Sequence, residues 1–238
     1  MAFRHGISAR VYVHNQNMSP YVEEATFEAS RALAEIRVLE ATAVQRVAGL
    51  RDVSLTLAGV YDTDAEGKVW NMISPAAIID GCFAFLPDGD TAGNTAYLGK
   101  VMLASEGADA GDDAVKMPVQ AMSSTDTDRG IVLHPLTERT TDSSTASVNN
   151  SADSHSGYQA YLECTAISAA AATLTCKIEH CDDNATWVQL VAFTNVTHVT
   201  GPTSEKKSAT GDVGQYIRVT WTITPGKAAT FFVGWMRN

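Results

Sequence analysis

The chain has 238 residues, 45% of them hydrophobic, and a formal net charge of −10. This length suits one large or two modest domains, and the negative charge argues against direct binding of nucleic acid, which needs basic patches. No apolar run approaches the about 18 residues that a membrane-spanning helix requires, and the first residues lack the apolar core of a secretion signal, so we expect no contact with a membrane.

The N-terminal third predicts mostly extended chain. Residues 7–14 alternate apolar and polar side chains and are predicted to form a strand. Residues 23–34 are ambiguous, because they are rich in helix-forming Ala, Glu, Leu and Arg. Residues 36–46 favour a strand.

The clearest alternation lies at residues 53–58. Val53, Leu55 and Leu57 alternate with three small uncharged residues, Ser54, Thr56 and Ala58. Alternation with a period of two places one set of side chains on a core and the other set on the opposite face of a strand. Gly59 is expected to bulge the end of this strand.

The middle of the chain predicts one helix and three strands. A helix is expected over 65–74, capped by Thr63 and Asp64, since Asp64 and Glu66 suit its N-terminus and Pro75 stops it. Strands are expected over 78–86, 97–105 and 114–124. Acidic residues crowd the intervening segments but lack the spacing of a calcium-binding loop, so these segments are interpreted as solvated loops.

The last hundred residues predict a series of short strands. Residues 137–157 are rich in Ser, Thr, Asn and Asp, which is typical of a linker, and we place a domain boundary near residue 140. Strands are expected over 158–167, 174–180, 186–194, 215–223 and 230–236. Short strands separated by polar turns are the signature of a β-sandwich.

The sequence contains no recognisable catalytic, nucleotide-binding or metal-binding motif. The histidines are scattered, and Cys176, His180 and Cys181 lack the second half of a zinc site. Cys164 and Cys176 lie in apolar registers and are interpreted as buried, reduced thiols. We therefore expect no enzyme activity, no cofactor and no metal.

Tryptophan side chains offer a possible sugar platform in the last hundred residues. Trp187, Trp221 and Trp235 could line it together with Tyr216. Trp221 shares a strand face with Val219, so a place in the core is the better interpretation for the set, while Trp187 follows a turn and could be exposed.

The strand at 53–58 and the residues around it resemble a known protein family. The strand is preceded by Gly49, Leu50 and Asp52 and followed by Gly59, Tyr61 and Asp62. This pattern resembles the first tube strand of the major tail (tail tube) proteins of long-tailed, siphovirus-type bacteriophages, and residues 9–30 and 38–44 are similar to the same family. The second half of the chain resembles small β-sandwich modules of phage tail proteins, some of which are similar to carbohydrate-binding sandwiches.

The resemblance implies a mainly β fold with two domains. Residues 1–140 would form a tail-tube-like β-sandwich or barrel with one flanking α-helix. Residues 141–238 would form a C-terminal β-sandwich that begins with the polar linker.

The resemblance also implies a function as a structural virion protein. Copies of the chain would form a ring, and rings would stack into a tube with other tail proteins, in the tail of a virion assembled in the host cytoplasm. Six copies would close the ring, or three if the second half were itself a tube domain. DNA would pass through the channel without specific binding.

In this interpretation Ser54, Thr56 and Ala58 face the channel. Their strand carries neither charge nor proline, the usual protection of an edge strand, so we expect it to pair with a neighbouring subunit. Two alternatives stay open. One is a tail or capsid decoration protein with a carbohydrate-binding β-sandwich, and the other is a hydrolase, for which the sequence offers no positive sign.

Overall fold

The computed structural model describes residues 8–36, 45–60, 80–107, 109–110, 115–125, 127–149 and 154–238. These residues form antiparallel β-sheets, and none of them lies in an α-helix. The helix predicted over 65–74 falls outside the described residues. The part of the chain that is described contains no helix long and apolar enough to cross a membrane.

The chain divides into two compact units. The first comprises Met1–Pro20, Gly81–Gly99 and Asp128–Asn238, and the second comprises Tyr21–Asp80 and Lys100–Thr127. The first unit contains residues from both sides of position 140. No boundary between the two units therefore lies at the predicted position. A division at residue 140 into independently folding domains stays a prediction.

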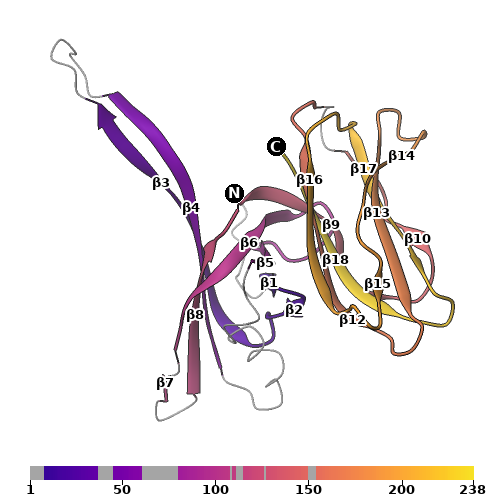
Figure 1. Ribbon diagram of the computed structural model, residues 1–238, viewed down its shortest axis with the longest axis horizontal. Coiled ribbons are helices and arrows are strands. Elements are labelled where there is room, and N and C mark those ends of the chain that lie inside the picture. Colours follow the sequence, from indigo (N-terminus) through magenta and orange to yellow (C-terminus); the bar gives the residue numbers. More distant parts are fainter. Residues whose placement is uncertain are drawn as a thin grey trace. The chain divides into compact units, whose positions relative to one another are not determined.

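Two sheets build the first unit (Figure 1). The order in the first sheet is β16–β12–β18–β9–β6–β5–β1–β2, and in the second β10–β17–β13–β14, with β11 beside β17 and β15 beside β13. The strands of the first sheet are β1 (Arg10–Val13), β2 (Gln16–Asn17), β5 (Gly81–Leu86), β6 (Thr95–Glu106), β9 (Asp128–Arg139), β12 (Tyr158–Ile167), β16 (Thr203–Ala209) and β18 (Ala229–Arg237). Residues 95–99 of β6 belong to the first unit, and residues 100–106 belong to the second. Those of the second are β10 (Ser143–Ser144), β11 (Val148–Asn149), β13 (Thr173–Cys181), β14 (Val188–Ala192), β15 (Val196–Thr197) and β17 (Tyr216–Ile223).

Apolar side chains from both sheets form one core. Leu162 of β12 and Phe231 of β18 belong to the same buried cluster as Ile178 of β13 and Val219 of β17. In β17 every second residue from Ile217 to Ile223 is buried, as the sequence alternation predicts. Two sheets with such a shared core form a sandwich.

The first sheet is apolar on its other face as well. Tyr12, Leu98, Tyr161 and Phe232 belong to a second buried cluster on strands β1, β6, β12 and β18. The sequence missed β9 and β16. β16 contains Glu205, Lys206 and Lys207 and has no apolar alternation, but as an edge strand of the sheet it needs no apolar outer side.

Several residues of the stretch predicted as a linker lie in strands: residues 137–139 end β9 of the first sheet, and β10 and β11 belong to the second sheet. Ser143 pairs with Trp221 and Val148 pairs with Ile217. The Oδ1 atom of Asp142 accepts a hydrogen bond from the amide of Ile223 at 2.7 Å. Polar residues suffice here because an edge strand has to satisfy the backbone of its neighbour, not fill a core. The linker prediction is wrong for these residues, and residues 150–153 lie outside the described part.

The second unit is a sheet in the order β3–β4–β8–β6, with the short β7 (Asp109–Ala110) also beside β8. Its long strands are β3 (Val22–Ile36), β4 (Gln45–Val60) and β8 (Val115–Ser123). Residues 23–34 therefore belong to a strand, although their composition favours a helix. Of the strand predicted over 36–46, residues 37–44 lie outside the described part.

β4 forms the middle of this sheet. Thr56 pairs with Thr26 of β3 on one side and with Gln120 of β8 on the other. The prediction that residues 53–58 form an edge strand is therefore wrong. Gly59 lies opposite a register shift in β3, where an added Cβ would come within 2.1 Å of the carbonyl oxygen of Tyr21. This close approach requires glycine. The extra residue lies on β3, between Val22 and Glu24, and not on the strand of Gly59 for which the bulge was predicted.

β3 and β4 continue beyond the rest of the sheet. β8 pairs with β4 only from Ser54 to Val60, whereas β3 pairs with β4 as far as Gln45. Figure 1 shows this two-stranded ribbon extending past β8. We call it the arm, defined as residues 30–36 of β3 and 45–52 of β4. Leu33 on the arm is 60% exposed.

Candidate functional site

The two faces of β4 differ as the sequence alternation predicts. Val53, Leu55 and Leu57 are at most 3% exposed. Thr56 between them is exposed, and Ser54 and Ala58 are partly exposed. The prediction that the apolar set faces the core is confirmed. That the other set faces a channel stays a prediction.

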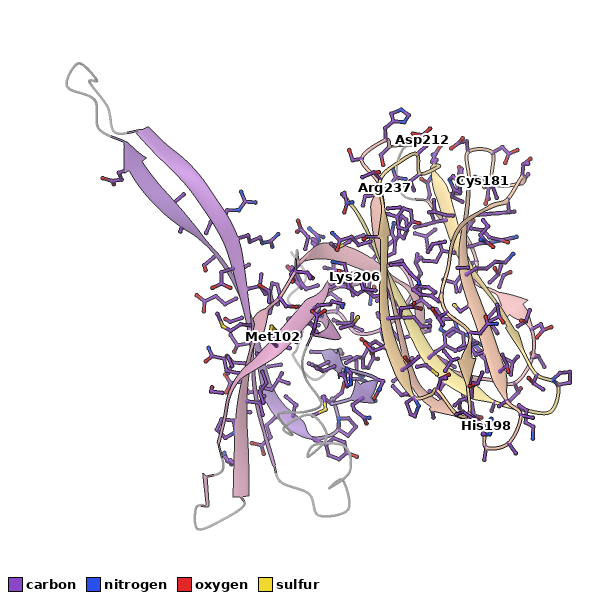
Figure 2. The ribbon with its side chains drawn as sticks, in the orientation of Figure 1. Met102, Cys181, His198, Lys206, Asp212 and Arg237 are labelled. Atoms are coloured by element: carbon purple, nitrogen blue, oxygen red, sulfur yellow. The ribbon has the colours of Figure 1, made fainter. Side chains whose placement is uncertain are left out.

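Neighbouring strands extend the side of Ser54, Thr56 and Ala58 into a continuous surface. Side chains of directly paired residues lie on the same side of an antiparallel sheet. We call this surface the open face; the pairings assign to it Glu24, Thr26 and Glu28 of β3, Ser54, Thr56 and Ala58 of β4, Lys116, Pro118, Gln120 and Met122 of β8, and Met102 of β6. Met102, labelled in Figure 2, is 44% exposed.

Small or uncharged side chains occupy most of the open face, and carboxylates mark its β3 side. Thr26, Thr56 and Gln120 form one row across the sheet. In the neighbouring rows Glu28 lies beside Ser54 and Glu24 lies beside Ala58. The sequence missed these two glutamates because the conformation of 23–34 was ambiguous. The signal that could have found them is the alternation of Glu24, Thr26 and Glu28 with Ala25, Phe27 and Ala29.

Lys116 of the open face and Lys100 of β6 both have carboxylate partners. The Nζ of Lys116 lies 3.6 Å from a carboxylate oxygen of Glu23, and both side chains are more than half exposed. The Nζ of Lys100 lies 2.6 Å from Oδ2 of Asp80. Asp80 also accepts a hydrogen bond from the hydroxyl of Ser124. The described part of the open face thus offers phosphate groups no unpaired lysine.

The described titratable side chains outside the open face do not gather into a metal site, and His134 among them is part of the core. No group of three or more metal-ligating side chains occurs among the described residues. His134 is fully buried; its Nε2 accepts a hydrogen bond from Arg139, and its Nδ1 donates one to the carbonyl of Phe231. Burial and the charge of Arg139 lower the pKa of His134 to about 4.

Cys164 and Cys176 are buried thiols, as predicted. Cys82 and Cys181 are buried as well; each of the four side chains is at most 6% exposed, and none of them forms a disulfide. Burial raises the pKa of Cys164 to about 11 and raises that of Cys176 further. These thiols are poorly suited to act as nucleophiles or metal ligands, because both roles need the thiolate.

The tryptophans do not form a shared sugar platform. Trp221 and Trp235 are buried in the sandwich core, at 4% and 1% exposure. Trp187 is partly exposed, and the guanidinium of Arg218 lies 4.2 Å from the centre of its ring. The same Arg218 donates from Nε to Glu179 at 2.8 Å. Tyr216 is also partly exposed, so Trp187 and Tyr216 are the members of the set that could contact a ligand.

Comparison with known proteins gives no family assignment by sequence. No family model matches the chain, and no curated protein matches it. Among solved structures, it is similar to a chain from the virion of a native gene transfer agent particle, with 16% identity and a TM-score of 0.43 over 53% of this chain and 98% of that one. It is also similar to the SPP1 Dit protein, described as a paradigm of the hub adsorption apparatus in phages that infect Gram-positive bacteria, with 11% identity and a TM-score of 0.39 over 96% of this chain and 99% of that one.

Proposed function

We propose that this chain is a structural protein of a phage tail, and more specifically a tail tube subunit. In this proposal copies form a ring, rings stack into a tube, and the open face lines the channel through which DNA passes. Support comes from the resemblance around residues 49–62 and from the composition of the open face. The described residues of the open face do not form a catalytic group that would favour an enzyme instead.

The observation that carries the proposal is the contrast between the two faces of β4. One face is sealed by Val53, Leu55 and Leu57, and the other combines small uncharged side chains with Glu24 and Glu28. Proteins that hold DNA use lysine and arginine to neutralise phosphates. The carboxylates of such a channel wall repel the phosphates of DNA weakly. Its lysines do not attract the phosphates, because they are already paired with carboxylates. This property suits passage rather than binding.

The arm supports assembly of the subunit with copies of itself. Isolated two-stranded ribbons are at best marginally stable in water. The arm has no third strand among the described residues, and its Leu33 is 60% exposed. Contact with a neighbouring subunit would bury this side chain and complete the sheet. In this proposal β3, rather than β4, offers the edge to which the neighbour adds.

Electron microscopy of the purified chain tests assembly. Negative-stain images at high concentration should show rings or tubes, and the rotational symmetry of the rings would decide between six and three copies. Leu33→Lys should leave the subunit folded, because the side chain is already exposed, but should abolish the rings.

Val199→Lys is the matched control for this substitution. Val199 is an exposed apolar residue of the first unit, at 79% exposure, and lies outside the arm. Its replacement should leave assembly intact. A wild-type chain that stays small at every concentration would contradict the tube proposal, and rings formed by Leu33→Lys would contradict the role of the arm.

A further inference from the structure

Glu163 is a buried carboxyl group that the proposed function does not use. It lies on β12, between Ser204 of β16 and Phe232 of β18, and is 1% exposed. A buried carboxyl group without a cationic partner is costly when it is charged, so its presence in a core needs a local explanation.

Both carboxyl oxygens are occupied. Oε2 accepts a hydrogen bond from the backbone amide of Asn15 at 2.7 Å, and Oε1 is bonded to the hydroxyl of Ser204 at 3.1 Å. Asn15 lies in the tight turn between β1 and β2, where it and His14 have φ values of 63° and 46°. A second hydrogen bond runs from Asn15 Nδ2 to the carbonyl of Pro202 at 3.3 Å. Glu163 thus ties the N-terminal hairpin to β12 and β16.

No charged group balances Glu163 among the described residues. On β16, Lys206 (Figure 2) lies over the ring of Tyr161, and Glu205 is paired with Lys207 at 2.7 Å. On β18 its neighbour is Phe232. On the β1–β2 turn the titratable group is His14, and burial lowers the pKa of this imidazole, which favours its neutral form.

These surroundings keep the proton on Glu163 at neutral pH. Burial raises its pKa to about 8, although the hydrogen bonds from Asn15 and Ser204 act in the opposite direction. A protonated carboxyl group can donate to Ser204 through one oxygen and accept from Asn15 through the other. The neutral form therefore satisfies both partners without a buried charge.

We propose that Glu163 is a proton-operated lock, which in its neutral form holds the β1–β2 turn on β12 and β16 and which releases that turn when the proton is lost. The ionised carboxylate needs water, and the short β2 is the element beside it with the fewest pairings to break. The rest of β12 is held by β16 and β18 on both sides and stays in place. This inference is independent of the tube proposal.

Hydrogen exchange of the full chain tests the lock. The protection of a peptide spanning residues 11–20, corrected for the intrinsic rate at each pH, should fall in the wild type as the pH rises from about 5 to about 8 and should level off above pH 8. Within this window the released carboxyl group is ionised while the buried one keeps its proton, so opening releases one proton and protection can fall by up to about tenfold per pH unit. Glu163→Gln has the shape of the protonated acid, so its protection should stay constant over this range.

Ser204→Ala provides a second, independent readout. The hydroxyl of Ser204 favours the charged form of Glu163, so its removal should move the pH at which the fall levels off to a higher value rather than abolish the fall. A peptide on β8, which belongs to the second unit and pairs with none of the strands around Glu163, serves as the internal control and should not respond. The proposal is overturned if Glu163→Gln loses protection as the wild type does, if the protection of the wild type is constant between pH 5 and pH 8, or if the fall levels off at the same pH in Ser204→Ala and the wild type.

Discussion

At the scale of single residues, His134 shows how a polar side chain becomes part of a core. Its ring stacks on Phe231 at 4.4 Å and meets Trp221 edge-on at 4.9 Å, while both ring nitrogens are hydrogen-bonded. The sequence predicted only that the histidines are not a spaced ligand set. It could not place His134 in the core, because residues 125–136 had no assigned element and the aromatic neighbours come from the far end of the chain.

His134 should make the protein sensitive to mild acid. Its pKa is about 4 in the folded chain and 6.5 in its unperturbed state, so protons favour the unfolded chain between these values. Stability should be complete above pH 6.5 and should decline towards pH 4, by a total on the order of 3 kcal/mol. Urea unfolding at pH 7 and pH 4.5 measures the decline.

A neutral replacement at position 134 isolates this effect. His134→Gln should lower stability at pH 7 but should show a smaller decline between pH 7 and pH 4.5 than the wild type. His198→Gln, at an exposed position, should behave as the wild type does. An equal decline in His134→Gln and the wild type would assign the acid sensitivity to other groups.

At the scale of elements, the polar stretch after β9 is held by hydrogen bonds rather than by apolar burial. Besides the bond that the amide of Ile223 donates to Asp142, the carbonyl of Thr141 accepts a hydrogen bond from Trp221 Nε1 at 3.0 Å. Thr145 both donates to and accepts from the backbone of Val219. We expect residues 140–149 to resist a protease of broad specificity under native conditions.

Asp142→Ala tests the bond between its carboxylate and the amide of Ile223. Loss of one hydrogen bond from a backbone amide to a charged group costs roughly 1 to 2 kcal/mol, so local opening and cleavage should increase by about one order of magnitude. Ser144→Ala, at an exposed position of the same stretch, is the control and should be cleaved as slowly as the wild type. Rapid cleavage of the wild type within 140–149 would restore the interpretation of this stretch as a linker.

The elements that the sequence predicted well are those with an apolar face. The bounds expected for β12, 158–167, agree with Tyr158–Ile167, and those for β13, β17 and β18 agree within one residue at each end. Among the elements that it missed, β10, β11 and β16 contain Ser, Thr, Asn and Lys at edges of sheets. Edge strands are specified by the backbone of their neighbours, which no local pattern reveals. β9 was also missed, although it is a central strand, because its buried residues Val132, Leu133 and His134 are consecutive and do not alternate.

At the scale of the whole molecule, the sequence predicted the alternation of β4 but not its place in the sheet. Residues 53–58 contain neither charge nor proline, and this composition suggested a strand whose free edge pairs with a neighbouring subunit. The same composition suits a central strand equally well. Which of the two occurs depends on the pairing of β4 with β3 and with β8, and β8 follows it by more than fifty residues. The sequence therefore predicted three residues of the open face, namely Ser54, Thr56 and Ala58. The positions of Glu24 and Glu28 beside them are known only from the pairing of β3 with β4.

The tube proposal predicts that Thr56→Lys impairs the passage of DNA without unfolding the subunit. Thr56 is exposed, so a lysine there needs no burial and should change the free energy of unfolding by less than about 0.5 kcal/mol. The variant should still form rings and tubes. Each ring would then carry several unpaired cations on its wall, and every phosphate that passes would bind to them.

The rate of DNA release from particles assembled with the variant measures this effect, and a lower rate and lower infectivity are expected. Thr222→Lys, at an exposed position of β17, carries the same charge away from the open face and should release DNA at the wild-type rate. Leu55→Asp should fail to fold, because it buries an unpaired charge at a position that is 1% exposed. If Thr56→Lys unfolds the isolated subunit, its side of β4 belongs to a core, and if it folds, assembles and releases DNA normally, the open face does not line the channel.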